Sequence, residues 1–258
     1  MPVRTSYIQG TPNWVDLQTT DPVAAKAFYG PLFGWTFDDQ PIPDSPAVYS
    51  MAMKDDGVVG AITGQPPDLA AQNVPAMWNT YLAVDDVDAA AARVDASGGK
   101  ILMPPFEVMD AGRMAFVMDP TGAPVAMWQA GRTIGSTLVN EPGTVVWNDL
   151  RTDDPAAAAA FYSAVFGLNA EPQVWSGTAY VSLKTGDDPV GGISQRAADS
   201  DSSAWHVYFA VEDTLAVAEH ARALGATIVV EPTDSPIGPT ATIADPQGAV
   251  FSIISIAS

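Results

Sequence analysis

The chain has 258 residues, 47% of them hydrophobic and 16% charged, a balance that supports a sizeable buried core and excludes wholesale disorder. Its 30 acidic and 11 basic residues give a formal net charge of -19, which disfavours nucleic acid and anionic membranes as partners. The absence of cysteine excludes disulfides, thiolate nucleophiles and cysteine-based metal sites. Because the N-terminus lacks an apolar signal segment, we expect a soluble, cytoplasmic protein, although leaderless export leaves no mark in a sequence.

The first half of the chain predicts two βαβββ units in succession. Residues 14–19 alternate as a strand does, and a helix begins at Asp21, whose carboxylate caps free N–H groups before a proline. This helix ends at Gly34, and strands follow at 49–53 and 58–62. The second unit consists of a strand at 80–84, an alanine-rich helix at 87–96, and strands at 100–103, 113–118 and 124–129.

The second half of the chain repeats this series in the same order. WVDLQTTDPVAAKAFYGPLFG begins at Trp14, and WNDLRTDDPAAAAAFYSAVFG begins at Trp147. DPTGAPVAM, from Asp119, likewise corresponds to DPQGAVFSI, from Asp245. A repeat of this length indicates a duplicated module rather than a short-period solenoid. We therefore predict a first module at 1–130, a linker at 131–142 and a second module at 143–258.

These motifs resemble those of the vicinal oxygen chelate superfamily, which includes glyoxalase I, extradiol dioxygenases and bleomycin resistance proteins. The resemblance rests on the paired βαβββ units, the D-x-x-x-A-x-x-F-Y-x-x-x-F-G helix at 21–34 and 154–167, and the DPxG turn. The tandem form is similar to an actinobacterial hydroxylase-like or glyoxalase-like subfamily that includes a mycobacterial culture-filtrate antigen. The resemblance implies an α+β fold of two tandem glyoxalase-like modules, whose curled sheets face a central cleft.

Strand alternation assigns side chains to the two faces of each sheet. The set expected to face the cleft is Trp14, Asp16, Gln18, Asn79, Tyr81, Ala126 and Trp128. The set expected to pack on helices is Val15, Leu17, Leu82, Val84, Val125 and Met127.

Metal-dependent members of the superfamily carry ligands at positions that the resemblance transfers to six residues: Trp14, Asn79, Ala126, Trp147, His206 and Ser252. A divalent ion needs imidazole nitrogen or carboxylate oxygen from several directions, and only His206 offers either. We therefore predict no metal site of the family type and no cofactor. For His206, a hydrogen-bonded place in the cleft is the simpler interpretation, and His220 is expected on the surface.

The replacement of ligands by aromatic residues favours a pocket that binds a small aromatic or hydrophobic molecule, for sequestration or carriage. The candidate binding residues are Trp14, Trp147, Asn79, Tyr81, His206, Tyr208, Trp128 and Arg113. Two alternatives remain open: the aromatic residues fill the cleft completely, and Arg113 is an ordinary surface residue.

Asp16 and Asp149 are the candidate catalytic residues, because each follows the repeated tryptophan by two positions on the cleft face. Either carboxylate is a possible general base for a glyoxalase-like lyase or a tailoring hydroxylase or isomerase. Since both halves carry the aspartate, a structural pair that bonds backbone amides or Arg151 is the alternative. Whether any reaction is catalysed, and whether the chain is a monomer or a homodimer, stays open.

Overall fold

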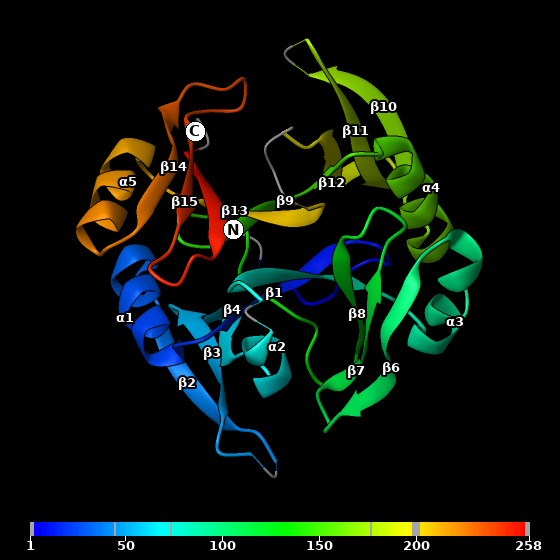
Figure 1. Ribbon diagram of the computed structural model, residues 1–258, viewed down its shortest axis with the longest axis horizontal. Coiled ribbons are helices and arrows are strands. Elements are labelled where there is room, and N and C mark those ends of the chain that lie inside the picture. The colour runs from blue at the N-terminus through cyan, green and yellow to red at the C-terminus, as the bar shows by residue number, and fades with distance from the viewer. Residues whose placement is uncertain (1–2, 44, 73, 176, 198–201, 256–258) are drawn as a thin grey trace.

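The computed structural model describes residues 3–43, 45–72, 74–175, 177–197 and 202–255, which form two eight-stranded sheets (Figure 1). The first sheet has the order β2-β3-β4-β1-β5-β8-β7-β6. Its strands are β1 (Pro12–Thr19), β2 (Thr36–Pro41), β3 (Val48–Lys54), β4 (Gly57–Gly64), β5 (Met77–Ala83), β6 (Lys100–Val108), β7 (Gly112–Met118) and β8 (Pro124–Ala130).

The second sheet repeats this order as β10-β11-β12-β9-β13-β16-β15-β14. Its strands are β9 (Val145–Thr152), β10 (Asn169–Trp175), β11 (Thr178–Thr185), β12 (Asp188–Gln195), β13 (Ala204–Ala210), β14 (Thr227–Thr233), β15 (Thr240–Ala244) and β16 (Val250–Ile254). In both sheets the first strands of the two βαβββ units, β1 with β5 and β9 with β13, pair antiparallel at the centre. The predicted arrangement, two tandem modules that each contain two βαβββ units, is confirmed.

Five α-helices lie among the described residues: α1 (Pro22–Phe33), α2 (Pro67–Ala71), α3 (Val87–Ala91), α4 (Pro155–Phe166) and α5 (Thr214–Ala223). The predicted caps of α1 and α4 are confirmed, since Asp21 and Asp154 each accept a backbone N–H at 2.9 Å. The helix predicted at 87–96 is shorter, because a 3-10 turn at Asp95–Ser97 replaces its end. Among the residues that the structure describes, no helix is long and apolar enough to cross a membrane.

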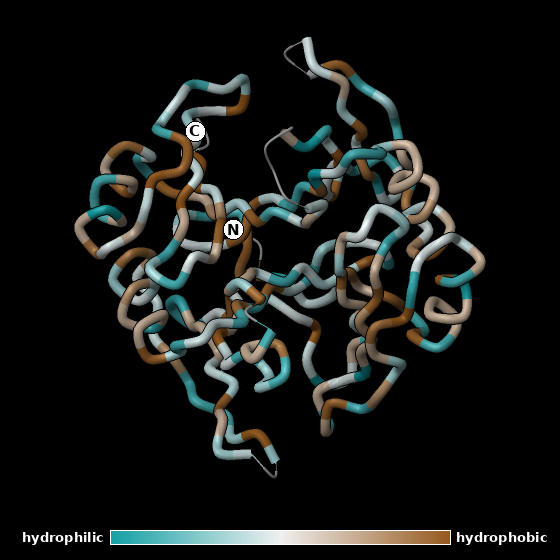
Figure 2. The backbone as a smooth tube through the Cα atoms, in the orientation of Figure 1, coloured by the Kyte–Doolittle hydropathy of each residue, from teal (hydrophilic) through white to brown (hydrophobic). Residues whose placement is uncertain are grey.

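The helices pack across the boundary between the modules. Figure 1 shows α1 beside α5 and α3 beside α4, and contacts join both pairs. One core cluster unites Phe28 and Tyr29 of α1 with Phe209 and Phe251 of the second sheet, and its counterpart buries Phe161 of α4 against the first sheet. Hydrophobic residues accordingly recur along the central strands in Figure 2. Every residue predicted to pack on helices is buried: Val15, Leu17, Leu82, Val84, Val125 and Met127.

Two buried hydrogen-bond chains connect the modules: one joins α1 to the DPxG turn of the second module, and the other joins α4 to the DPxG turn of the first. Tyr29 of α1 donates its hydroxyl to Asp245 Oδ2 at 2.9 Å and accepts the Trp78 indole N–H at 3.0 Å. The other carboxylate oxygen of Asp245, Oδ1, accepts the backbone N–H groups of Gln247 and Ala249 in the same turn. In the mirrored chain, Trp205 donates to Tyr162, and Tyr162 donates to Asp119. These chains give the repeated Phe-Tyr and Asp-Pro motifs a structural role between modules.

The segment at 131–142, predicted as a linker, lies against the first module. Ser136 N donates to Asn13 O at 2.8 Å, and Thr137 N donates to Val58 O at 2.8 Å. Leu138 also forms an isolated β-bridge with Val3. The N-terminal segment and this connection therefore pack together at the start of β1.

Candidate functional site

The face of each sheet opposite α1, α3, α4 and α5, called the inner face below, carries the candidate residues. In the first module Trp14 is paired with Tyr81, Asp16 with Asn79, and Tyr81 with Ala126. Trp14, Tyr81, Ala126 and Trp128 form one apolar cluster. The alternation of the sequence therefore placed these side chains on the correct face.

Asp16 is the polar centre of the first inner face. Its carboxylate accepts hydrogen bonds from Tyr49 Oη at 2.9 Å, Asn79 Nδ2 at 2.9 Å and Tyr81 Oη at 2.6 Å. Trp14 Nε1 donates to Tyr49 Oη at 2.8 Å and extends the network. Burial raises the pKa of the Asp16 carboxyl above its ordinary value, and the three hydrogen bonds lower it in part. With 2% of Asp16 exposed, this arrangement is that of a buried structural network.

Asp149 occupies the equivalent position in the second module and has a different set of partners. Tyr180 donates to Asp149 Oδ1 at 2.8 Å, and Ser194 donates to Oδ2 at 3.0 Å. Trp147 Nε1 donates to Tyr180 Oη at 3.1 Å, as Trp14 does to Tyr49. Burial raises the pKa of the Asp149 carboxyl, and its hydrogen bonds and the nearby Arg151 charge oppose that rise.

Arg151 and His206 make the second inner face more polar than the first. Arg151 donates to Tyr208 Oη at 3.0 Å, and its guanidinium lies 6.0 Å from the centre of that ring. Among the described residues it forms no ion pair within 4.0 Å. His206 Nε2 lies 2.7 Å from Ser252 Oγ, and burial together with Arg151 lowers the pKa of its imidazole well below the usual range. The imidazole is therefore neutral at neutral pH.

The two inner faces differ in how far they are closed. Trp14, Asp16, Tyr81 and Trp128 are 8%, 2%, 4% and 8% exposed, so the first face is filled by its own side chains. On the second face, Trp147, Arg151 and Tyr208 are only half-buried, whereas Tyr180 is half-buried like its first-module counterpart Tyr49. The rings of Trp14, Tyr81 and Trp128 are thus closed off in the first module, while Trp147 and Tyr208 are accessible in the second.

The six positions that correspond to metal ligands do not provide a suitable donor set. Trp14 and Trp147 donate their indole N–H groups to tyrosines, Asn79 donates its amide to Asp16, and Ala126 has no donor atom. In the second module His206 and Ser252 bond to each other. No group of three or more His, Asp or Glu residues suited to a metal ion is present in the described ranges. The residues at these positions therefore do not fit the metal of the family type.

Arg113 does not lie with the other candidates. It forms ion pairs with Asp88 and Glu107. Met114 belongs to the inner-face cluster and Ala115 to the helix-side core, so alternation places Arg113 on the helix side of β7 with Ala115. Its interpretation as a ligand-binding residue is replaced by the surface alternative. Arg151 does lie on an inner face. The sequence signal for it is strand alternation, because Trp147, Asp149 and Arg151 stand at alternate positions on one side of β9. His220 is exposed on α5, as expected.

Comparison with known families agrees with this fold and motif set. A model of the Glyoxalase/Bleomycin resistance protein/Dioxygenase superfamily matches residues 11–127, and a Glyoxalase-like domain matches residues 145–254. The chain belongs to the glyoxalase/bleomycin resistance/dioxygenase superfamily and carries two of its domains. The protein named "Putative glyoxylase CFP32" of Mycobacterium tuberculosis (strain CDC 1551 / Oshkosh) is 52% identical to it, over 98% of each chain. "Anthracycline biosynthesis protein DnrV" of Streptomyces peucetius is 35% identical, over 98% of this chain and 95% of its own.

Solved structures share the fold at low sequence identity. The Mn(II)-bound glyoxalase from Novosphingobium aromaticivorans has a TM-score of 0.66 and 17% identity, covering 96% of this chain and 83% of that one. The 2,3-dioxygenase LapB from Pseudomonas sp. KL28 has a TM-score of 0.68 and 15% identity, covering 98% and 94%. At these identities the likeness concerns the fold alone, and the vicinal oxygen chelate architecture is confirmed.

Proposed function

We propose that the inner face of the second module binds a small aromatic molecule without a metal ion of the family type. The observation that carries this proposal is the group of half-buried rings, Trp147, Tyr180 and Tyr208, around a guanidinium that forms no ion pair with a described residue. The positions where metal-dependent relatives hold ligands bear tryptophan, histidine and serine in this module. The role is sequestration or carriage of the bound molecule.

The chemistry of this face favours a flat ligand with an oxygen substituent. Ring-on-ring contacts contribute about 0.5–1.5 kcal/mol each beyond the area they bury, so three accessible rings support micromolar binding. Arg151 offers N–H donors to a carboxylate or carbonyl oxygen, and a planar guanidinium suits such groups. Neutral His206 adds no second positive charge. The name of DnrV connects a relative to anthracycline biosynthesis, and anthracyclines are fused-ring molecules with oxygen substituents.

Anthraquinone-2-carboxylate is expected to bind this face, with affinity measured by isothermal titration calorimetry. Trp147→Leu or Arg151→Met should weaken binding about tenfold or more, which corresponds to ~1.4 kcal/mol. The matched control is Trp14→Leu, the same change on the closed face, which should leave the affinity within about twofold. Treatment with a chelator should also leave it unchanged. Equal weakening by both tryptophan variants, or binding that requires an added divalent ion, would contradict the proposal.

Catalysis by Asp149 is the second candidate function, favoured by its raised pKa on an open face and by the glyoxylase name of CFP32. Asp149 would act as the general base in a lyase or isomerase reaction on an α-oxoaldehyde adduct or a related metabolite. If so, Asp149→Asn should lower kcat by about 10²–10⁴-fold, measured spectrophotometrically on a methylglyoxal–thiol adduct. Asp16→Asn is the matched control, since the carboxylate of Asp16 is enclosed by its own partners. Unchanged turnover in Asp149→Asn would remove this candidate.

A further inference from the structure

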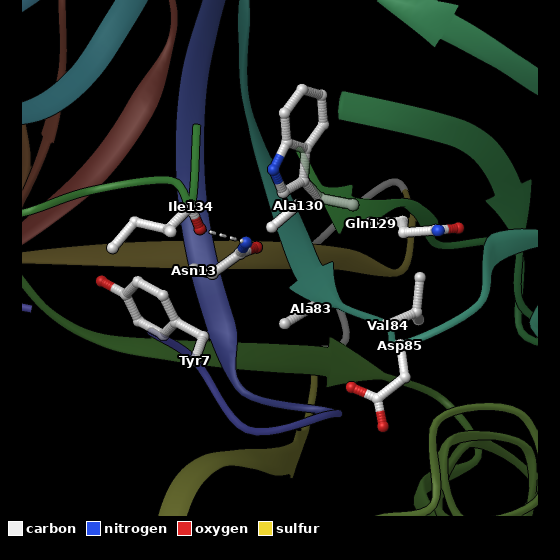
Figure 3. Close-up of a pocket in the computed structure, with 9 residues that line it drawn as sticks. Tyr7, Asn13, Ala83, Val84, Asp85, Gln129, Ala130 and Ile134 are labelled. Carbon is white, nitrogen blue, oxygen red and sulfur yellow. Dashed lines mark hydrogen bonds between the residues drawn. The ribbon is translucent and has the colours of Figure 1, made fainter. Parts of the chain in front are cut away.

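A pocket of about 210 Å³ lies in the first module, away from the inner face of the second (Figure 3). It is formed where the ends of β5 and β8 meet the start of β1, the N-terminal segment and the connection between the modules. Its lining residues are Tyr7, Asn13, Ala83, Val84, Asp85, Trp128, Gln129, Ala130 and Ile134. Ligand pockets for drug-sized molecules are usually about 300–1,000 Å³, so this one suits a smaller molecule.

Asn13 gives the pocket a buried acceptor with a fixed orientation. Its Nδ2 donates to Ile134 O at 2.9 Å, and because a carbonyl accepts only from a donor, the amide cannot be turned around. The other amide atom, Oδ1, is buried and has no hydrogen-bond partner among the described residues. Figure 3 shows this oxygen on the side of the amide that faces away from Ile134. An unsatisfied buried acceptor is unfavourable, and Asn13 is 2% exposed, so an N–H donor in the pocket would relieve that cost.

The charges around the pocket favour a cation over a neutral donor. Asp85 is exposed at the rim, and its carboxylate forms no ion pair within the described ranges. Trp128, held by a 2.8 Å hydrogen bond to Thr133 O, supplies an aromatic surface that suits a cation or an apolar group. Two basic residues lie close to the lining residues: exposed Arg4, 5.8 Å from the centre of the Tyr7 ring, and Arg132, which is paired with Asp110. The net charge of -19 also attracts cations to this surface.

The duplication shows that this pocket is not part of the common scaffold. Alignment of the two halves places Val146 and Ile254 at the positions of Asn13 and Trp128. The acceptor and the aromatic surface are therefore specific to the first module, whereas the scaffold motifs recur in both.

We propose that this pocket binds a small organic ammonium ion. An N–H of the ammonium group donates to Asn13 Oδ1, its charge is paired with Asp85, and its apolar part lies against Trp128 and Ile134. This site is independent of the aromatic-ligand face proposed for the second module.

Benzylammonium chloride is the probe, and benzyl alcohol is its uncharged counterpart of similar shape. In two-dimensional ¹H–¹⁵N NMR titrations of the full chain, benzylammonium should shift the Asn13 side-chain amide and the Trp128 indole N–H. Its Kd should lie below about 1 mM, and the alcohol should bind at least about tenfold more weakly. Asp85→Asn should weaken benzylammonium binding about fivefold or more, and added NaCl should do the same.

Glu212→Gln is the matched control, because Glu212 is the exposed acidic residue at the position of Asp85 in the second module. It should change the Kd by less than about twofold. Asn13→Val, which copies the second module, should abolish binding in protein that retains its wild-type NMR fold pattern. Three results would each overturn the proposal: no shift of the Asn13 amide at about 5 mM probe, equal affinity for the alcohol, or an unchanged Kd in Asp85→Asn.

Discussion

Replacing Tyr29 by phenylalanine is expected to lower the free energy of unfolding by about 2–5 kcal/mol. The change removes one oxygen and leaves two buried partners unsatisfied, Asp245 Oδ2 and the Trp78 indole N–H. Each unsatisfied buried group costs about 1–3 kcal/mol, more when it is charged. The phenyl ring retains the packing with Trp35 and Phe251, so the loss comes from hydrogen bonding. Urea-induced unfolding, followed by circular dichroism, measures the difference.

The duplication supplies both a replicate and a control for this prediction. Tyr162→Phe breaks the mirrored chain between Trp205 and Asp119 and should cost a similar amount. Tyr208→Phe also removes a hydroxyl that is hydrogen-bonded, here to Arg151, but on a half-buried face. Because water can replace the lost partner there, we expect a cost below about 1 kcal/mol. A Tyr29→Phe protein as stable as wild type would show that the intermodule chains do not contribute to stability.

The second large effect concerns pH and Asp16. Burial raises the pKa of the Asp16 carboxyl in the folded state above that of the unfolded chain, which is about 3.9. The protonated form is therefore favoured by folding. Its contribution to stability is fully present below about pH 4 and is lost as the pH rises through the folded-state pKa. Asp16→Asn cannot titrate, so the wild-type free energy of unfolding minus that of the variant should fall with rising pH, by up to ~1.4 kcal/mol per pH unit.

Paired urea-unfolding series between about pH 4 and 7 test this slope. Asp149→Asn should show a change of the same sign but smaller size, because the Arg151 charge opposes the rise in the Asp149 pKa. Asp187→Asn, at an exposed turn position, serves as the control and should leave the slope unchanged. A difference that grows with rising pH for Asp16→Asn would mean that hydrogen bonding outweighs burial in this network.

Much of the fold follows from local sequence features. The Asp-Pro pairs fix the starts of α1 and α4, and the alternation around Trp14 and Trp147 fixes which face of each central strand lies inward. Other elements lack such signals: β2 is an edge strand of mostly exposed residues, and α2 has five residues and buries none. The contacts of α1 with the second module, beyond those with its own sheet, were not predictable, because the apolar stripe of a helix does not specify which second surface it packs against.

The positions of the candidate side chains were predicted in part, and the differences have physical causes. Strand alternation brought Trp14, Asp16, Asn79 and Tyr81 together, but it does not report how closely side chains fill the space between them. Arg113 was singled out for its lack of a counterpart, although alternation places it on the outer side of β7. The ammonium pocket combines Tyr7, Asn13 and Ile134 with the ends of two strands, and its parts are joined only by tertiary contacts.

The crossed packing of helices makes the chain resemble a symmetric dimer whose two subunits have been fused. Its internal boundary is isologous: α1 packs on its own sheet and also contacts α5 and side chains of the second sheet, and α4 makes the corresponding contacts with its own sheet, α3 and the first sheet. Neither half buries its apolar surface alone, so the covalent connection chiefly raises the effective concentration of one half for the other. Fusion also allows the two halves to acquire different residues at equivalent positions, whereas the subunits of a homodimer share one sequence. One face has become solid packing, and the other retains exposed rings and an arginine.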